Sequence, residues 1–245
     1  MNQYFLSVII PVYNEAQRLP NSMRNLLAYL NQQSYSYEIV VVENGSTDDT
    51  YRIACEFSRL YPNVRVIQEQ QKGKGLAVRR GMLEATGKYR FMCDVDFSMP
   101  IMAINRFFPP NLQGYDIAIA SREVEGAVRY NEPAYRHLVG RIFNLLIRWL
   151  ALPNFNDTQC GFKCFHSRVV DDLFGKQTIR GWTFDVEILF IAQLRGYSII
   201  EVPISWYFNP DSKVNVLRDG VRMGLDLIAL KRKARRGLYA CFNEK

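Results

Sequence analysis

The 245-residue sequence lacks an uninterrupted apolar run of the roughly 20 residues needed to cross a bilayer, so no transmembrane helix is expected. It has two histidines and five cysteines. Cys160 and Cys164 lie close together, but no second Cys/His pair completes a zinc site. Low-complexity tracts and the pattern of a secretory signal peptide are also missing. These absences argue against a zinc-stabilised fold and predict a reduced protein on the cytoplasmic side of a membrane.

The composition is that of an ordinary globular protein, with 48% hydrophobic and 22% charged residues. The length suits one large α/β domain or two small ones. The net charge is +7, and residues 231–236 hold five cations in six positions. A basic chain suits nucleic acid, anionic lipid or phosphorylated substrates, so charge alone does not choose the partner.

Short apolar segments rich in β-branched residues alternate with segments of helical periodicity through the first half of the chain. The expected strands lie at residues 6–12, 38–42, 63–68, 89–93 and 115–120. Apolar residues at helical spacing separate them, as at Leu19, Met23 and Leu26. This alternation predicts an α/β fold with a mostly parallel central sheet covered by helices on both faces.

Polar residues follow the strands where each one ends, at Tyr13, Glu43, Lys74, Asp94 and Asp96. Right-handed crossovers bring the carboxyl ends of parallel strands to one edge of the sheet, where open α/β sheets bind ligands. Asp94 and Asp96 stand at i and i+2 on an extended segment, so their carboxylates point to the same side and repel each other. Oxygen ligands of this kind favour Mg²⁺ or Mn²⁺, which commonly bridges substrate phosphates. The pair therefore predicts a metal site.

The segment Lys72-Gly73-Lys74-Gly75 opens the helix that follows the third strand. Its backbone N–H groups and its two lysines can hold an anion. An ordinary surface turn with solvated lysines is the alternative.

The second half of the chain has a different character. Residues 123–133 are polar and predict a mobile loop. Residues 135–152 are very apolar, with one polar stripe that includes Arg141 and Arg148. This pattern fits either a buried core helix or a helix lying in a membrane interface, for which Trp149 and the arginines are suited. A last amphipathic helix ends in the basic cluster, which suits its own dipole and also an anionic membrane surface.

Seven segments, taken in order, carry a resemblance to a known family: S-V-I-I-P-V-Y-N-E, E-I-V-V-V-E-N-G-S-T-D-D-T, G-K-G-L-A, D-V-D-F-S, S-R, D-T-Q-C-G-F-K and W-T-F-D-V-E. The chain resembles the family 2 glycosyltransferases of the GT-A fold from about residue 6 to residue 230. Within them it is most similar to the polyprenyl-phosphate sugar transferases. The segments D-T-Q-C-G-F-K, F-D-V-E and E-V-P-I-S-W are closer to the dolichyl-phosphate β-glucosyltransferase branch than to the mannosyl branch.

The resemblance implies a role for each matching residue. The nucleotide would be lined by Pro11, Tyr13, Glu15, Glu43, Asn44, Lys74 and Asp94. The metal on the diphosphate would be held by Asp94 and Asp96. The lipid phosphate would be received by Arg122, Arg136, Lys163 and Lys213. The family usually has two aspartates where this chain has Glu43 and Asn44, so the contacts to the base or ribose are expected to differ.

The implied reaction moves a hexose, expected to be glucose from UDP-glucose, onto a polyprenyl or dolichyl phosphate with inversion at the sugar carbon. The same fold using GDP-mannose, or a polysaccharide or glycolipid hydroxyl as acceptor, is the alternative. A phosphate acceptor is largely ionised near neutral pH, so positioning and electrostatics should dominate. Asp157 is the first candidate for orienting or deprotonating the acceptor, with Asp185 second and Glu187 third. A loop-capping role for Asp157 and a helix-dipole role for the other two are the plainer explanations.

The expected domain organisation is one glycosyltransferase domain over residues 1–213 and a basic amphipathic helix over residues 214–245. Residues 1–122 would form the nucleotide half of the domain, and residues 123–213 the acceptor half. The expected location is peripheral, at the cytoplasmic face of a membrane, with a homo-oligomer or a membrane-protein partner left open. Two other classes of protein fit parts of the sequence less well. A nucleic-acid-binding protein has only the basic charge in its favour, because no recognition motif is present. A catalytically inert sugar-nucleotide-binding scaffold is opposed by the intact Asp94/Asp96 pair.

Overall fold

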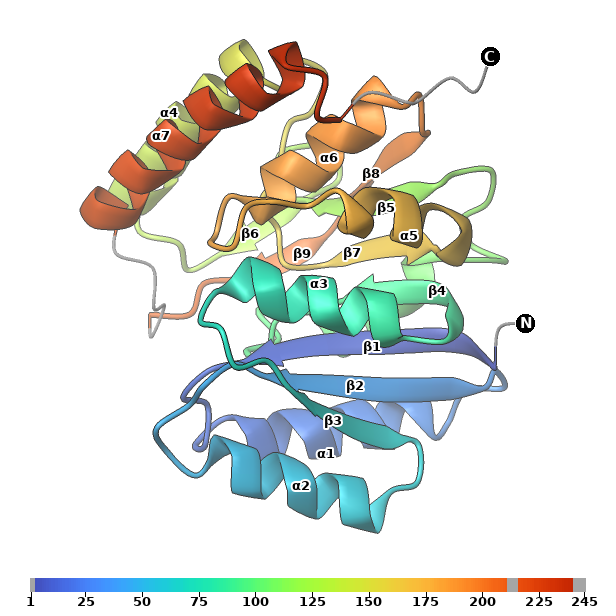
Figure 1. Ribbon diagram of the computed structural model, residues 1–245. Coiled ribbons are helices and arrows are strands. Elements are labelled where there is room, and N and C mark those ends of the chain that lie inside the picture. The colour runs from blue at the N-terminus through green and yellow to red at the C-terminus, as the bar shows by residue number, and fades with distance from the viewer. Residues whose placement is uncertain (1–2, 211–215, 240–245) are drawn as a thin grey trace.

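The computed structural model describes residues 3–210 and 216–239 of the chain. Its strands are β1 (Tyr4–Val12), β2 (Tyr37–Glu43), β3 (Val64–Gln68), β4 (Gly87–Met92), β5 (Ile117–Ser121), β6 (Val128–Tyr130), β7 (Lys163–His166), β8 (Ile199–Pro203) and β9 (Ser205–Tyr207). Seven of them form a central sheet in the order β3-β2-β1-β4-β7-β5-β8 (Figure 1). Only β7 runs antiparallel to its neighbours in this sheet. The predicted α/β fold with a mostly parallel sheet is confirmed.

Helices cover both faces of the sheet. They are α1 (Leu19–Leu30), α2 (Thr50–Leu60), α3 (Lys74–Glu84), α4 (Ala134–Leu150), α5 (Ser167–Gly175), α6 (Phe184–Leu194) and α7 (Val216–Arg235), with a 3₁₀ helix at Ile101–Phe107. One core cluster joins α1, α2 and the 3₁₀ helix to the sheet, and a second joins α3, α5 and α6 to its other face.

The alternation of side chains along the strands explains why both faces are covered. In β1, Val8 and Ile10 belong to the first core cluster, whereas Ile9 belongs to the second. Successive side chains of a strand point to opposite faces, so a strand that is apolar throughout needs a hydrophobic layer on each side. All three side chains are completely buried. The β-branched composition of β1 therefore fixes its central place in the sheet.

The segment 123–133 contains more order than its polar sequence predicted. Residues Val128–Tyr130 form β6, which pairs in parallel with β9 in a separate two-stranded sheet. The rings of Tyr130 and Tyr207 stack across this pair at 4.5 Å between centroids. The expectation of a loop is wrong for these three residues. Their pairing partner lies more than 70 positions away in the sequence, and local composition does not reveal it.

Helices α4 and α7 lie side by side beyond one end of the sheet (Figure 1). Only Ile147 of α4 is fully buried, so the first of the two alternatives for this segment, a buried core helix, is wrong. Its exposed apolar side chains are Tyr135, Leu138, Val139, Ile142, Leu145 and Trp149, and α7 adds Leu225 and Ile228. None of the described helices is long and apolar enough to cross a membrane.

Candidate active site

The polar residues that end the strands meet at one edge of the sheet. Two cavities open there. The first, which we name the β1 cavity, has a volume of about 670 Å³ and follows the ends of β1 and β2. The second, the α4 cavity, has a volume of about 310 Å³ and reaches from the end of β4 to helices α4 and α7. Five residues line both cavities and form their junction: Lys74, Asp94, Asp96, Trp182 and Met223.

All but one of the residues predicted to line a nucleotide lie at the β1 cavity. Pro11, Tyr13, Glu15, Asn44, Lys74 and Asp94 all line the β1 cavity. Glu43 does not. It is buried, and its carboxylate accepts hydrogen bonds from the Ser46 N–H and the Gln68 side chain. The prediction that Glu43 contacts the base or ribose is therefore corrected, because both of its oxygens face the protein.

Asn44 shapes the wall of the β1 cavity. Its amide donates to the carbonyls of Glu69 and Gln71, and its oxygen accepts from the Gly73 N–H at 2.7 Å. These bonds hold the loop that leads into Lys74. An amide supplies both donor and acceptor, whereas an ionised aspartate can only accept, so asparagine suits this position. The departure from the usual pair of aspartates thus has a local structural reason.

The junction concentrates charge. Asp94 and Asp96 follow β4, and the ammonium of Lys74 lies 2.6 Å from Asp94 Oδ1. Burial and the neighbouring Asp94 raise the pKa of Asp96. Burial lowers the pKa of Lys74, but Asp94, Asp185 and Asp96 outweigh it, so the net shift is upward. Gly161 lies so close to Asp94 that a Cβ there would overlap its carboxylate, and only glycine admits the side chain in this position.

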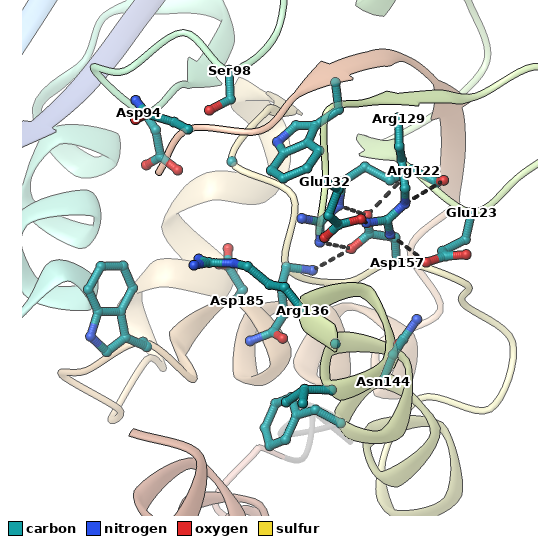
Figure 2. A pocket seen from close by; sticks show the side chains of 18 of the residues that line it. Asp94, Ser98, Arg122, Glu123, Arg129, Glu132, Arg136, Asn144, Asp157 and Asp185 are labelled. Atoms are coloured by element: carbon teal, nitrogen blue, oxygen red, sulfur yellow. Dashed lines mark hydrogen bonds and ion pairs between the residues drawn. The ribbon is translucent and has the colours of Figure 1, made fainter. Parts of the chain in front are cut away.

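A cluster of paired charges occupies the far end of the α4 cavity (Figure 2). Arg122 binds Asp157 through two bonds, Nε–Oδ2 at 2.6 Å and Nη2–Oδ1 at 3.0 Å. Arg129 pairs with Glu123 and Glu132 at 2.5 and 2.6 Å. Such forked guanidinium–carboxylate bonds fix both partners.

Asp157 is a poor proton acceptor in this arrangement. Burial would raise its pKa, but the Arg122 charge and hydrogen bonds from Arg122 and Gln159 outweigh burial and hold the pKa at about 2. A base works best with a pKa near the operating pH. The geometry therefore argues against the first-ranked catalytic candidate and assigns Asp157 to holding Arg122 in place.

Arg136 differs from the other two arginines of the α4 cavity. It projects from the first turn of α4 and lies over the ring of Phe208 at 5.1 Å. Among the described residues it has no carboxylate within ion-pair distance, whereas Arg122 and Arg129 are each neutralised. Figure 2 shows its side chain reaching away from the paired cluster, toward the side where Asp185 and Asp94 lie.

Lys163 and Asp185 form a buried pair. Lys163 is only 1% exposed and lines neither cavity. Its Nζ lies 2.8 Å from Asp185 Oδ1 and donates to the Cys160 carbonyl at 2.6 Å. The prediction that Lys163 receives a phosphate is therefore corrected. Asp185 does line the α4 cavity, and burial raises its pKa against the opposing charges of Lys163 and Lys74.

Glu187 lies outside both cavities. It is fully buried, and its carboxylate accepts hydrogen bonds from the Thr178 and Ile179 backbone and from the Tyr239 hydroxyl. The prediction of a catalytic role for Glu187, the third candidate, is therefore corrected: its carboxylate links the segment before α6 to Tyr239, which follows α7. Lys213, the remaining predicted phosphate ligand, lies outside the described residues.

Several lining residues were not predicted from the sequence. Arg129, Glu123 and Glu132 come from the segment taken for a loop. Trp206 of β9 lies against both Arg122 and Arg129, 5.4 and 5.8 Å from its ring. Helix α7, expected to be a separate appendage, contributes Met223 to the junction. Trp182 is the first residue of the W-T-F-D-V-E segment, and its place in that segment was the one available signal.

Comparison with known proteins gives a consistent result. The model of the family described as "Glycosyl transferase family 2" matches residues 7–174. A dolichyl-phosphate beta-glucosyltransferase of Dictyostelium discoideum is 30% identical over 98% of this chain and 77% of its own length. The protein of the same name from Saccharomyces cerevisiae is 32% identical over 97% of this chain and 77% of its own length. The human one is 32% identical over 92% and 74%.

Solved structures share the fold at low sequence identity. Glucosyl-3-phosphoglycerate synthase from Mycobacterium tuberculosis, in complex with Mn²⁺, UDP-glucose and phosphoglyceric acid, superimposes with a TM-score of 0.68 at 19% identity. The alignment covers 96% of this chain and 80% of that one. The same enzyme has also been crystallised with Mg²⁺ and UDP, with the same TM-score of 0.68. These likenesses establish the GT-A fold.

Proposed function

The chain belongs to glycosyltransferase family 2, and from that premise we propose that it transfers glucose from UDP-glucose to the phosphate of a polyprenol at a membrane surface. The observation that carries the proposal is the meeting of two cavities at Asp94 and Asp96. One cavity suits a nucleoside diphosphate. The other holds arginines and opens beside an exposed apolar helix pair. The names and ligands of the relatives above support this donor and this acceptor.

The β1 cavity would hold the donor. Its lining includes four cations suited to a diphosphate: Lys72, Lys74, Arg180 and Arg222. Tyr13 offers a ring for the base, with the Lys72 ammonium 5.3 Å from its centroid. The N-terminal end of α3 lies at this cavity, so the positive end of the helix dipole also favours an anion there. The N–H groups of Gly73 and Gly75 are bonded to Asn44 and Arg180, so the predicted contribution of these two groups to anion binding is corrected.

Asp94 and Asp96 would hold a divalent metal, Mg²⁺ or Mn²⁺. The donor set fits, because both ligands are carboxylates and, among the described residues, the ammonium of Lys74 offsets only one of their two charges. Among the described residues no group of three or more His, Cys, Asp or Glu side chains is placed to hold a metal, so Asp94 and Asp96 are the two protein ligands that we propose. When bound, the metal neutralises negative charge on the leaving diphosphate.

Arg136 would capture the acceptor phosphate. A phosphate monoester is mostly dianionic near neutral pH, since its second pKa is about 6. The guanidinium of Arg136 has no carboxylate partner in the described part of the chain, so it can offer the phosphate a bidentate fork without first breaking an ion pair there. Arg122 and Arg129 keep their carboxylate partners and would shape the site around it. Lys213 stays a predicted ligand.

Asp185 would orient the acceptor or take a proton from it. It lines the cavity, and its raised pKa brings it closer to neutral pH than Asp157. Since the acceptor is already ionised, little proton transfer would be needed, and in-line attack would invert the sugar carbon.

The exposed faces of α4 and α7 would rest on the membrane. Trp149 is 80% exposed, and Leu138, Ile142 and Leu145 lie on the same helix. Arg141 and Arg148 of α4 and the basic end of α7 are also exposed and suit anionic lipid, as found on a cytoplasmic leaflet. Because Val139, Phe143 and Met223 line the α4 cavity, this arrangement would let an isoprenoid phosphate reach Arg136 from the bilayer.

A transfer assay tests the proposal. Purified protein is mixed with polyprenyl phosphate in detergent or vesicles and with labelled UDP-glucose or GDP-mannose, with Mn²⁺ or Mg²⁺ and with EDTA. We expect label in the extractable lipid only from UDP-glucose, abolished by EDTA and by Asp94→Ala. The matched control is Asp49→Ala, an exposed carboxylate of an ion pair on α2, which should retain activity. No lipid product from UDP-glucose, despite UDP binding, would refute the proposed acceptor. Labelling from GDP-mannose instead would refute the proposed donor.

A further inference from the structure

The hexose has to pass from the donor cavity to the acceptor cavity, so on the proposed function it sits at their junction. Three of the five junction residues, Lys74, Asp94 and Asp96, are charged. The other two, Trp182 and Met223, are apolar. We propose that the Trp182 indole, backed by Met223, is the platform on which the transferred hexose rests, and that it selects glucose over hexoses with an axial hydroxyl.

Close backbone packing fixes Trp182 at the junction. The Gly75 N–H at the start of α3 donates to the Arg180 carbonyl at 2.9 Å. A Cβ at Gly75 would lie 2.7 Å from the Ile179 carbonyl oxygen. A Cβ at Gly73 would overlap the Arg180 carbonyl oxygen. Only glycine allows this approach. The segment that carries the indole is therefore held directly against the loop that carries Lys74.

Charge orients the indole within that segment. The Lys74 ammonium lies 4.9 Å from the centroid of the Trp182 ring, within the range of a cation–π interaction. The same ammonium binds Asp94. The ring is thus placed relative to the carboxylates that would hold the metal.

Helix α7 supplies the second half of the platform. Met223 is 7% exposed and reaches both cavities. Asp226, also on α7, accepts a hydrogen bond of 2.7 Å from the hydroxyl of Thr183, the residue that follows Trp182. Trp182 and Met223 are therefore tied together. Both lie outside residues 7–174, the part matched by the family model, so the match itself assigns them no role.

Hexose stereochemistry explains why an aromatic platform would favour glucose over mannose and galactose. Glucose carries its C2, C3 and C4 hydroxyls in equatorial positions, so its ring faces present C–H groups that suit an indole. Mannose and galactose each place one hydroxyl, at C2 and C4 respectively, axially on the same ring face. Placing that face against Trp182 would bury the axial hydroxyl without a hydrogen-bond partner, which is unfavourable. A flat apolar platform therefore favours the equatorial epimer.

The test separates the hexose from the nucleotide. The transfer assay gives kcat/KM for UDP-glucose and UDP-galactose, and UDP, which lacks the hexose, is measured as a competitive inhibitor. For Trp182→Leu we expect kcat/KM with UDP-glucose to fall about tenfold or more, the preference over UDP-galactose to shrink, and the Ki of UDP to stay within about twofold. Trp182→Phe should keep most of the preference, because it keeps a flat ring. Tyr51→Leu, which removes an exposed ring from α2, is the matched control.

Three outcomes overturn the inference. If UDP inhibition weakens as much as glucose transfer falls, Trp182 acts through Lys74 and the diphosphate instead. If Trp182→Leu transfers glucose with unchanged preference, the indole is not the platform. If the wild-type protein transfers no sugar from either UDP donor, the proposed function fails first, and the platform fails with it.

Discussion

Replacing Asp157 by asparagine distinguishes a structural carboxylate from a catalytic one. Asp157→Asn keeps the shape of the side chain but removes the charge that pairs with Arg122. Asp157 is 3% exposed, so solvent screens the pair little. Its pKa is about 2 in the folded protein against an ordinary value of 3.8. At about 1.4 kcal/mol per unit, this shift corresponds to about 2 kcal/mol of stability, and stranding the Arg122 charge adds to the loss.

The pH dependence has a definite sign. Since the folded-state pKa lies below the unfolded-state value, the ionised carboxylate stabilises the fold fully above pH 3.8 and loses this effect as pH falls through about 2. Urea unfolding at pH 7 should therefore show a loss of about 2–4 kcal/mol for Asp157→Asn, a difference that narrows below about pH 4. The control Asp49→Asn breaks an exposed pair and should change the unfolding free energy by less than about 1 kcal/mol.

The opposite result would refute the reasoning. An Asp157→Asn protein as stable as wild type, with transfer activity that has lost its acidic limb, would mean that Asp157 titrates near neutral pH and serves as the base.

The remaining predictions concern other parts of the molecule. Lys163→Met and Asp185→Asn should each lower the unfolding free energy by about 3 kcal/mol, because removing one partner leaves the other buried charge unpaired. The double variant should lose clearly less than the sum of the two. Additive losses in urea unfolding would contradict the pairing. Glu38→Gln should destabilise the protein by about 1–3 kcal/mol without changing the KM for UDP-glucose. This buried carboxylate accepts hydrogen bonds from Ser7, Thr86 and Arg65 at the edge of the sheet opposite Asp94. A raised KM would show that Glu38 also affects donor binding. The double change Leu145→Ser and Trp149→Ser should weaken co-sedimentation with anionic vesicles at least about tenfold while Tm stays near the wild-type value, because both side chains are exposed. Undiminished vesicle binding would show that another surface meets the lipid.

The site was predicted best where it follows from the strands themselves. Asp94 and Asp96 directly follow an apolar strand, and Tyr13 and Asn44 follow two others. The carboxyl ends of parallel strands come together at one edge whatever the details of packing. The sequence alone was therefore sufficient to bring these residues to one place.

The partners with which the buried charged side chains form ion pairs were not predictable in the same way. No local pattern indicates that Asp157 binds Arg122, 35 positions away, or that Lys163 neutralises Asp185. A buried charge takes whichever opposite charge the packing brings within reach, and its pKa follows from that partner. Two predicted roles changed for this reason, those of Asp157 and Lys163.

Amino-acid order by itself determined the α/β class, the sheet edge that holds the site and the family, because strand patterning and short motifs are local properties. Tertiary structure alone decided which face of α4 is exposed and that Met223 of α7 joins Trp182 at the junction. An amphipathic helix has the same periodicity whether its apolar face meets a core or remains exposed. Only the position of the rest of the chain distinguishes the two cases.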